Sequence, residues 1–162
     1  AREIIDYLKK QGSIRVSMPY GEACLRTPPG KPLLLVVAGT GFAQAKSLVD
    51  FLRDNRMSQP VHLYWGARDE ADMYLRELAE RWESEWPQFR FRPVICEADS
   101  LSDCHHERLV QAILSDGHEL DDVTVMACGS PAMVYTVLDG LADKGLGADA
   151  FFSDVLQYAP RD

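Results

Sequence analysis

A glycine turn follows a run of six apolar residues in the first third of the chain. The run covers 33–38, and Gly39-Thr40-Gly41 comes directly after it. Glycines at this point permit a tight turn, and the next helix offers unpaired N–H groups and its positive dipole end to a phosphate. The turn therefore favours nucleotide binding, although ordinary strand-to-helix turns also contain glycine. Gln44 replaces the third glycine of the dinucleotide fingerprint, and no Walker A lysine follows, which argues against an ATPase.

A second candidate group follows the apolar run 61–65. It contains Gly66, Arg68 and Asp69, with Tyr74 one helical turn further on. A guanidinium group binds phosphate and also stacks on adenine, so Arg68 is a candidate contact for a nucleotide. The alternative is a surface arginine paired with a neighbouring acid. For Tyr74 we prefer a place in the core to a role as an adenine platform.

A third group follows the apolar run 123–127. Cys128 stands at the predicted strand end, Gly129 leaves room for a ligand, and Ser130 is placed to cap a helix that Pro131 begins. Met133 lies in the first turn of that helix. A free cysteine is usually a small buried residue, but the glycine turn at 39–41 makes a ligand-facing role for Cys128 the better interpretation.

Other reaction chemistries find little support. No Ser-His-Asp order and no pair of acids flanking a pocket emerges, so hydrolysis is unsupported. Cys104-His105-His106, with Cys96, contains metal-binding residue types. Neighbouring helix residues point in different directions, however, so we expect a helix surface and no metal site. The four cysteines form no Cys-x-x-Cys pair and are expected to be reduced cytoplasmic thiols.

The elements that position these groups alternate along the chain. Apolar runs predict strands over 33–38, 61–65, 89–95, 123–127 and 150–152, and periodic segments predict helices over 42–53, 70–86, 106–114 and 131–144. This order requires crossover connections, which build a parallel sheet with helices on both faces. We therefore predict a doubly wound, Rossmann-like α/β fold with a mostly parallel five-stranded sheet. Pro93 and alternating arginines place the strand over 89–95 near an edge.

The first 31 residues do not fit this alternation. Residues 2–10 form an amphipathic helix pattern, 14–18 alternate like a strand, and Thr27-Pro28-Pro29-Gly30 indicates a linker. We place a domain boundary there, because one helix and one strand cannot bury a core of their own.

Composition excludes several classes of partner. The chain has 162 residues and a formal net charge of −8, so neither nucleic acid nor an anionic membrane surface is an expected partner. No apolar run approaches the roughly 20 residues that span a bilayer.

The motifs at the three strand ends resemble those of the ferredoxin–NADP reductase superfamily. They are Gly39-Thr40-Gly41, Tyr64-Trp65-Gly66-Ala67-Arg68, Cys128-Gly129-Ser130-Pro131 with Met133, and the closing Phe152-Ser153-Asp154. Pro19-Tyr20-Gly21-Glu22-Ala23 followed by Leu25-Arg26 is similar to the NAD(P)H:flavin oxidoreductase branch. The resemblance implies that residues 1–31 are the end of a flavin-binding barrel plus a linker, and that residues 32–162 are the NAD(P)-binding domain.

The resemblance also implies roles for the residues at the strand ends. Gly39, Thr40 and Gly41 would meet the pyrophosphate and the nicotinamide side of NADH or NADPH, and Gly66, Arg68 and Asp69 would flank the adenosine half. Cys128, as the candidate catalytic residue, and Gly129 would face the nicotinamide ring, in a pocket shaped by Ser130, Pro131 and Met133. Hydride would pass from the nicotinamide to N5 of an FAD or FMN that is held mainly by sequence upstream of Ala1. Electrons would then pass to free flavin, an iron–sulfur protein or an oxygenase.

Two alternatives remain from the residues themselves. A non-catalytic nucleotide-binding or regulatory module fits a chain without the flavin signature Arg-x-Tyr-Ser. An S-adenosylmethionine-dependent methyltransferase also cradles its ligand with a glycine loop, but it usually carries an acid at the end of its second strand, where this chain has Gly66-Ala67-Arg68.

Overall fold

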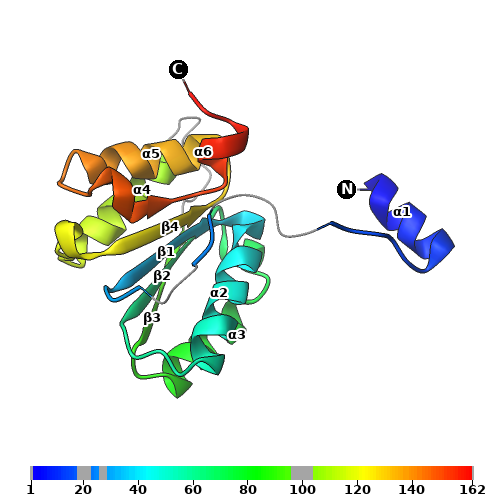
Figure 1. Ribbon diagram of the computed structural model, residues 1–162, viewed down its shortest axis with the longest axis horizontal. Helices are drawn as coiled ribbons and strands as arrows, with labels where there is room; N and C mark the ends of the chain where they lie inside the picture. Colours follow the sequence, from blue (N-terminus) through cyan, green and yellow to red (C-terminus); the bar gives the residue numbers. More distant parts are fainter. Residues whose placement is uncertain (1, 18–22, 26–28, 96–103, 162) are drawn as a thin grey trace.

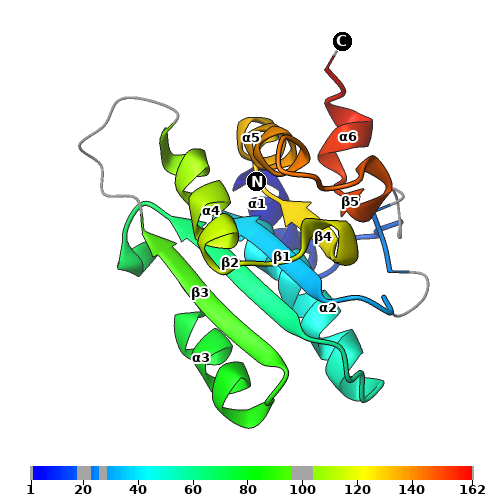
Figure 2. The same cartoon turned by 90° about the vertical axis from the view of Figure 1, so that its left-hand side faces the viewer.

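The computed structural model describes residues 2–17, 23–25, 29–95 and 104–161, with only the backbone described at 104 and 105. Five strands form one sheet in the order β3-β2-β1-β4-β5, and all neighbouring strands are parallel (Figure 2). The strands are β1 (Leu33–Ala38), β2 (Val61–Ala67), β3 (Phe89–Ile95), β4 (Thr124–Cys128) and β5 (Phe151–Phe152). The predicted doubly wound sheet is confirmed, and β3 lies at an edge as Pro93 indicated.

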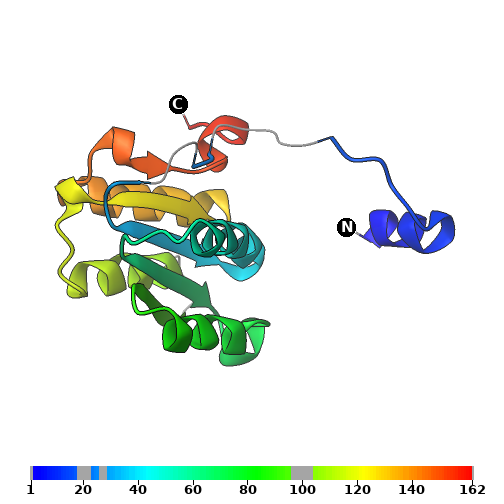
Figure 3. The same cartoon turned by 60° about the horizontal axis from the view of Figure 1, so that its bottom comes forward.

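Helices cover both faces of this sheet (Figures 1 and 3). The helices α2 (Phe42–Asp54) and α3 (Arg76–Glu85) pack on one face, and α4 (Cys104–Ser115) and α5 (Pro131–Ala142) pack on the other. Side chains of β1 alternate between the two cores: Leu35 and Val37 belong to the α2–α3 side, and Leu34 and Val36 to the α4–α5 side. Because both faces are buried, the strand is apolar throughout rather than alternating. The shorter elements are η1 (Gly39–Gly41), η2 (Glu70–Asp72), η3 (Leu120–Asp122), η4 (Ala148–Ala150) and α6 (Val155–Tyr158).

The carboxyl ends of β2, β1 and β4 lie side by side. Ala38 is level with Gly66, and Val37 is level with both Trp65 and Cys128. Adjacent strands in a sheet are roughly 5 Å apart, so the segments after these residues leave the sheet close together. Ligands of open parallel sheets bind at this edge. The register therefore brings the three candidate groups of the sequence to one place.

The helix predicted over 70–86 begins later than expected. The carboxylate of Asp69 accepts a hydrogen bond from the Asp72 N–H at 3.1 Å, so it caps the short η2 and not α3. Met73 then leaves helical geometry, with φ −86° and ψ 67°, while its side chain enters the core. Helix α3 begins only at Arg76. The interruption gives Tyr74 a different environment from the one that the helical pattern predicted.

The N-terminal segment contains the predicted helix but not the predicted strand. Helix α1 (Arg2–Gln11) has no buried residue and lies apart from the α/β body (Figure 1). Residues 13–17 have no regular structure, and Met18 lies outside the described residues. A strand needs a neighbour for its backbone hydrogen bonds, and residues 13–17 pair with no strand in the part of the chain that is described. Among the described residues, no helix has the length and apolar character needed to cross a membrane.

Candidate functional site

The glycine turn packs directly on the end of β4. A Cβ atom added to Gly41 would lie 2.0 Å from the backbone oxygen of Cys128, so no other residue fits without a shift of the backbone. Gly39 has a φ of +51°, a left-handed conformation that favours glycine, and no atom lies within 4 Å of the position of its Cβ. The turn is therefore packed against β4 at Gly41 and leaves open space beside Gly39. Helix α2 begins immediately after it, at Phe42.

A first cavity of about 450 Å³ lies on one side of this turn, between the ends of β1 and β2 and the helix α4. Gly39 and Thr40 line it together with Gly66 and Arg68 from the second predicted group. The complete lining set is Ala38, Gly39, Thr40, Gly66, Ala67, Arg68, Asp72, Tyr74, His106 and Leu109. The volume is typical of a small-molecule site.

Arg68 is available to a ligand in this cavity. It makes no hydrogen bond or ion pair with another described residue, because its acidic neighbours have other partners or orientations. Glu70 pairs with Arg76 at 2.8 Å, and Asp69 caps η2. The surface-pair alternative for Arg68 is therefore wrong among the described residues. Asp69 does not line the cavity, whereas Asp72 does.

Tyr74 lines the same cavity, and the expectation that it belongs to the core is wrong. The residue is 52% exposed, and its ring meets Phe42 and Trp65 edge to face, with centroid distances of 5.9 Å and 5.5 Å. Both partners are fully buried. The break between η2 and α3 produces this arrangement, since a continuous helix would have carried Tyr74 in a different direction. The Tyr74 ring thus packs on two buried aromatic side chains, and its exposed part faces the first cavity.

A second cavity of about 480 Å³ lies on the other side of the turn. It shares Ala38, Gly39 and Thr40 with the first and extends across the end of β4 to the segment after β5. The remaining lining residues are Gly41, Gln44, Ala127, Cys128, Gly129, Ser130, Ser153, Asp154, Val155 and Tyr158. The two cavities therefore flank one glycine turn and together cross the ends of β2, β1 and β4.

The Cys128 thiol in the second cavity is held in its neutral form. Burial raises the pKa of this thiol to about 12, and the nearby Asp154 carboxylate acts in the same direction. Asp154 itself accepts a hydrogen bond of 2.7 Å from the Gln44 amide, which joins α2 to the segment after β5. A neutral thiol offers a compact, weakly polar surface, and it is not a nucleophile at neutral pH.

Three of the predicted residues, Ser130, Pro131 and Met133, lie at the N-terminal end of α5. The Ser130 hydroxyl accepts a hydrogen bond from the Met133 N–H at 3.3 Å and caps the helix, as the sequence indicated. Met133 is fully buried beneath Gly129, where an added Cβ would lie 2.4 Å from its terminal methyl group. Ser130 lines the second cavity, whereas Pro131 and Met133 line neither cavity. Met133 therefore lies beneath the residues that line the second cavity, and neither Pro131 nor Met133 is placed to contact a ligand there.

Metal binding has no counterpart in the described side chains. No group of three His, Cys, Asp or Glu residues in that part of the chain is placed to hold a metal ion. Cys96 and the side chains of Cys104 and His105, which belong to the motif considered above, lie outside the described residues.

Comparison with known proteins identifies the family. The family model of the oxidoreductase NAD-binding domain matches residues 35–139, a segment that contains the ends of β1, β2 and β4. The chain belongs to the oxidoreductase NAD-binding domain family.

Relatives of this family member include several reductases. The chain is 35% identical over 158 residues to reductase component 2 of terephthalate 1,2-dioxygenase from Comamonas sp., covering 97% of this chain and 47% of the relative. It is 30% identical over 152 residues to an NAD(P)H-flavin reductase from Vibrio harveyi, covering 93% of this chain and 64% of the relative. The chain thus spans about half the length of the first of these relatives.

Solved structures show the same fold. A cytochrome P450 reductase from Amycolatopsis superposes with a TM-score of 0.71 at 25% identity, over 85% of this chain and 42% of that one. A ferredoxin NADP+ reductase from Neisseria gonorrhoeae superposes with a TM-score of 0.66 at 19% identity, over 83% of this chain and 60% of that one. The sequence resemblance to the ferredoxin–NADP reductase superfamily is confirmed by the family model and by the named reductases.

Sequence patterns do not predict three of the residues that line the cavities of this NAD-binding domain. Asp72 and His106 line the first cavity, and Tyr158, which is 65% exposed, lines the second. His106 and Tyr158 come from elements that approach the strand ends only in three dimensions. The one available signal was the position of Asp72 and Tyr74 shortly after a strand end.

Proposed function

We propose that this chain is the NAD(P)H-binding half of a flavin-dependent oxidoreductase. The observation that carries the proposal is the pair of cavities on either side of Gly39-Thr40, which share one glycine turn and cross three strand ends. Each has room for one nucleoside, and the turn between them suits the pyrophosphate that joins two nucleosides. A ligand made of two nucleosides and a central phosphate group is a dinucleotide.

The chemistry of the lining residues assigns an orientation to that dinucleotide. The first cavity offers the unpaired Arg68 guanidinium and the supported ring of Tyr74, which suit a phosphate and an adenine. The second cavity offers the neutral thiol of Cys128 beside the capped helix start at Ser130. We assign the adenosine half to the first cavity and the nicotinamide half to the second.

The residues of the chain bind and orient the nucleotide in this proposal. Gly39 and Gly41 bring the backbone close to the phosphates, and the positive dipole end of α2 lies at the same turn. The Phe42 N–H at the start of α2 already donates to carbonyls of the turn. Cys128 contacts the nicotinamide ring as a neutral group and takes no proton from it. A bound reduced nicotinamide supplies hydride, which N5 of FAD or FMN accepts, and the protein contributes proximity and orientation.

The flavin is assigned to the part of such an enzyme that these residues do not include. Residues 1–31 are proposed to be the end of that flavin-binding unit, and residues 32–162 the nucleotide domain. The exposed apolar side chains of α1, among them Ile4, Ile5 and Tyr7, support this division because they suit contact with another surface. The names of two relatives support free flavin or an oxygenase as electron acceptor, and the name of the ferredoxin NADP+ reductase with the same fold supports an iron–sulfur protein. From the free Cys24 and Cys128 we infer a cytoplasmic location.

Titration with NADH, NADPH and S-adenosylmethionine tests this proposal. We expect NADH or NADPH to bind saturably by calorimetry and to quench Trp65, which underlies Tyr74, while S-adenosylmethionine does neither. Saturable binding of S-adenosylmethionine alone would replace the proposal with the methyltransferase alternative. Absence of any response to NADH and NADPH would contradict it outright.

A further inference from the structure

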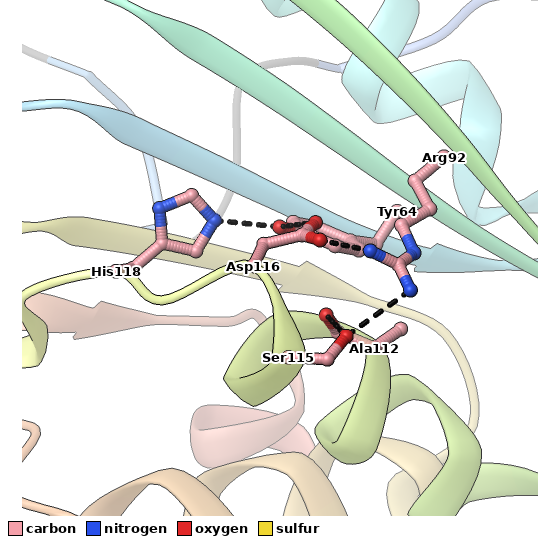
Figure 4. A network of polar contacts seen from close by, with 6 residues as sticks. All are labelled: Tyr64, Arg92, Ala112, Ser115, Asp116 and His118. Atoms are coloured by element: carbon pink, nitrogen blue, oxygen red, sulfur yellow. Dashed lines mark hydrogen bonds and ion pairs between the residues drawn. The ribbon is translucent and has the colours of Figure 1, made fainter.

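A polar network centred on the buried Tyr64 side chain lies on the α4 side of the sheet, outside the two cavities (Figure 4). We call it the Tyr64 network, consisting of Tyr64 from β2, Arg92 from β3, and Ser115, Asp116 and His118 from the end of α4 and the segment after it. Tyr64 is only 1% exposed, so its hydroxyl needs partners within the protein. The proposed function does not use any of these residues.

The Tyr64 hydroxyl is the centre of the network. It donates a hydrogen bond to Asp116 Oδ2 at 2.7 Å and lies 2.6 Å from His118 Nε2. Because a hydroxyl has one proton, His118 Nε2 is the donor in the second bond. The side chain of Arg92 donates to the other oxygen of Asp116 and, at 3.1 Å, to the Ser115 hydroxyl. The last turn of α4 is therefore joined to both β2 and β3.

The opposite end of α4 forms a wall of the first cavity. His106 and Leu109 line that cavity, and Leu109 lies against the bare backbone of Gly66 at the end of β2. A Cβ at Gly66 would be 3.1 Å from Leu109 Cδ1, and a Cβ at Gly140 would be 2.7 Å from Val110 Cγ1. Helix α4 thus packs closely on the glycine backbone of β2 and of α5.

The packing between α4 and β3 is incomplete. A hollow of about 450 Å³ lies between β3 and α4, lined by residues of both elements including Arg92 and Arg108. Arg108 makes one bond across it, to the Ile95 carbonyl at 3.1 Å. Val94 of β3 belongs to the apolar core beneath α4. Around the hollow itself, polar contacts connect α4 with β3, and most of them belong to the Tyr64 network.

From this arrangement we infer that Tyr64, Asp116 and His118 are positioning residues that set the width of the adenosine end of the nucleotide cleft through α4. The inference rests on the proposed function. A helix is stiff over the 12 residues of α4, so a shift of its last turn moves His106 and Leu109 as well. None of the residues that line the second cavity belongs to α4, so we expect them to keep their places.

The test uses Tyr64→Phe, which removes the hydroxyl and keeps the ring. We expect its affinity for NADH and for AMP to fall roughly three- to tenfold, the effect of one hydrogen bond. Its affinity for nicotinamide mononucleotide should stay unchanged. Amide hydrogen exchange should accelerate in α4 and remain as it was in β1 and β4. Asp116→Ala should behave in the same way, and Asp116→Asn, which keeps an acceptor for Tyr64, should recover part of the affinity.

Leu141→Ala is the matched control for a general loss of stability. Leu141 is fully buried at the far end of α5 and touches neither cavity, so truncation should lower stability while affinity for NADH stays within about twofold. Equal affinities of Tyr64→Phe and the unaltered chain, or equal losses for AMP and nicotinamide mononucleotide, would overturn the positioning role while the proposed function stands. Failure of the unaltered chain to bind NADH would overturn the proposed function and this inference with it.

Discussion

At the scale of single residues, contact between Gly41 and Cys128 joins the two halves of the cleft. The backbone oxygen of Cys128 lies where any side chain at position 41 would begin. The glycine turn and the end of β4 are consequently one rigid unit. A thiol with a raised pKa, about 12, adds no charge at this junction, which suits a pocket for an uncharged or delocalised ring.

Gly41→Ala tests this unit directly. Because the new Cβ would meet a backbone atom at 2.0 Å, we expect the turn to shift, affinity for NADH to fall at least tenfold and the free energy of unfolding to fall by about 1–3 kcal/mol. Gly30→Ala is the control, since nothing lies within 4 Å of its Cβ position. Calorimetric titration and urea unfolding measure both effects. Gly41→Ala with the affinity of the Gly30→Ala chain would show that the turn is not part of the site.

Individual side chains of the site were harder to predict than its location. Gly39 and Cys128 stand directly after apolar runs, and Arg68 stands three residues after one, so such positions can be predicted from the sequence. Tyr74 was placed in the core because it falls within a helical pattern, but Met73 interrupts the helix. His106 reaches the cavity only because α4 packs on Gly66, a tertiary contact with no local signal.

At the scale of elements, the strands can be predicted from their runs of apolar residues, whereas the packing positions of the helices cannot. β1 is apolar at every residue because helices cover it on both sides, and this makes it readable from sequence. The seat of α4 depends instead on bare glycine backbone and on the Tyr64 network, whose members come from separate elements. His62 packs edge to face on His118 beside this network, with 4.6 Å between ring centroids.

The two imidazoles make stability depend on pH. Burial lowers the pKa of His62 below 6.5, with His118 and Arg90 acting in the same direction and Asp116 against it; burial also lowers the pKa of His118, again opposed by Asp116. The remaining polar neighbours of the pair are the Tyr64 hydroxyl and Arg92. The unfolded chain therefore binds protons more readily than the folded one, and stability is complete above about pH 6.5 and lost as pH falls.

We expect urea unfolding to give a free energy that declines between pH 7 and pH 5, by at most about 1.4 kcal/mol per pH unit for each proton taken up. His62→Gln should reduce this slope, because it removes one of the two histidines whose pKa the fold lowers. Tyr7→Phe, on the exposed face of α1, is a control that should keep the slope of the unaltered chain. A free energy that is constant or rises toward pH 5 would contradict the description of these two histidines.

At the scale of the whole molecule, one edge of the sheet carries the proposed function. The carboxyl ends of β2, β1 and β4 meet there, and the two cavities continue one another across the glycine turn. The formal net charge is −8, which does not attract an anionic nucleotide, so recognition depends on local groups such as Arg68 and the start of α2. The family assignment and the geometry of this edge point to the same ligand class.

The most direct test is a nuclear magnetic resonance titration of the isotopically labelled chain with NADH. We predict that amide signals at 39–41, 66–68 and 128–130 shift together along one saturable curve, since one dinucleotide touches all three strand ends. Signals of the outer face of α3 should stay in place. Shifts confined to one side of the glycine turn, or the same three groups responding to S-adenosylmethionine and not to NADH, would contradict a dinucleotide lying across this edge.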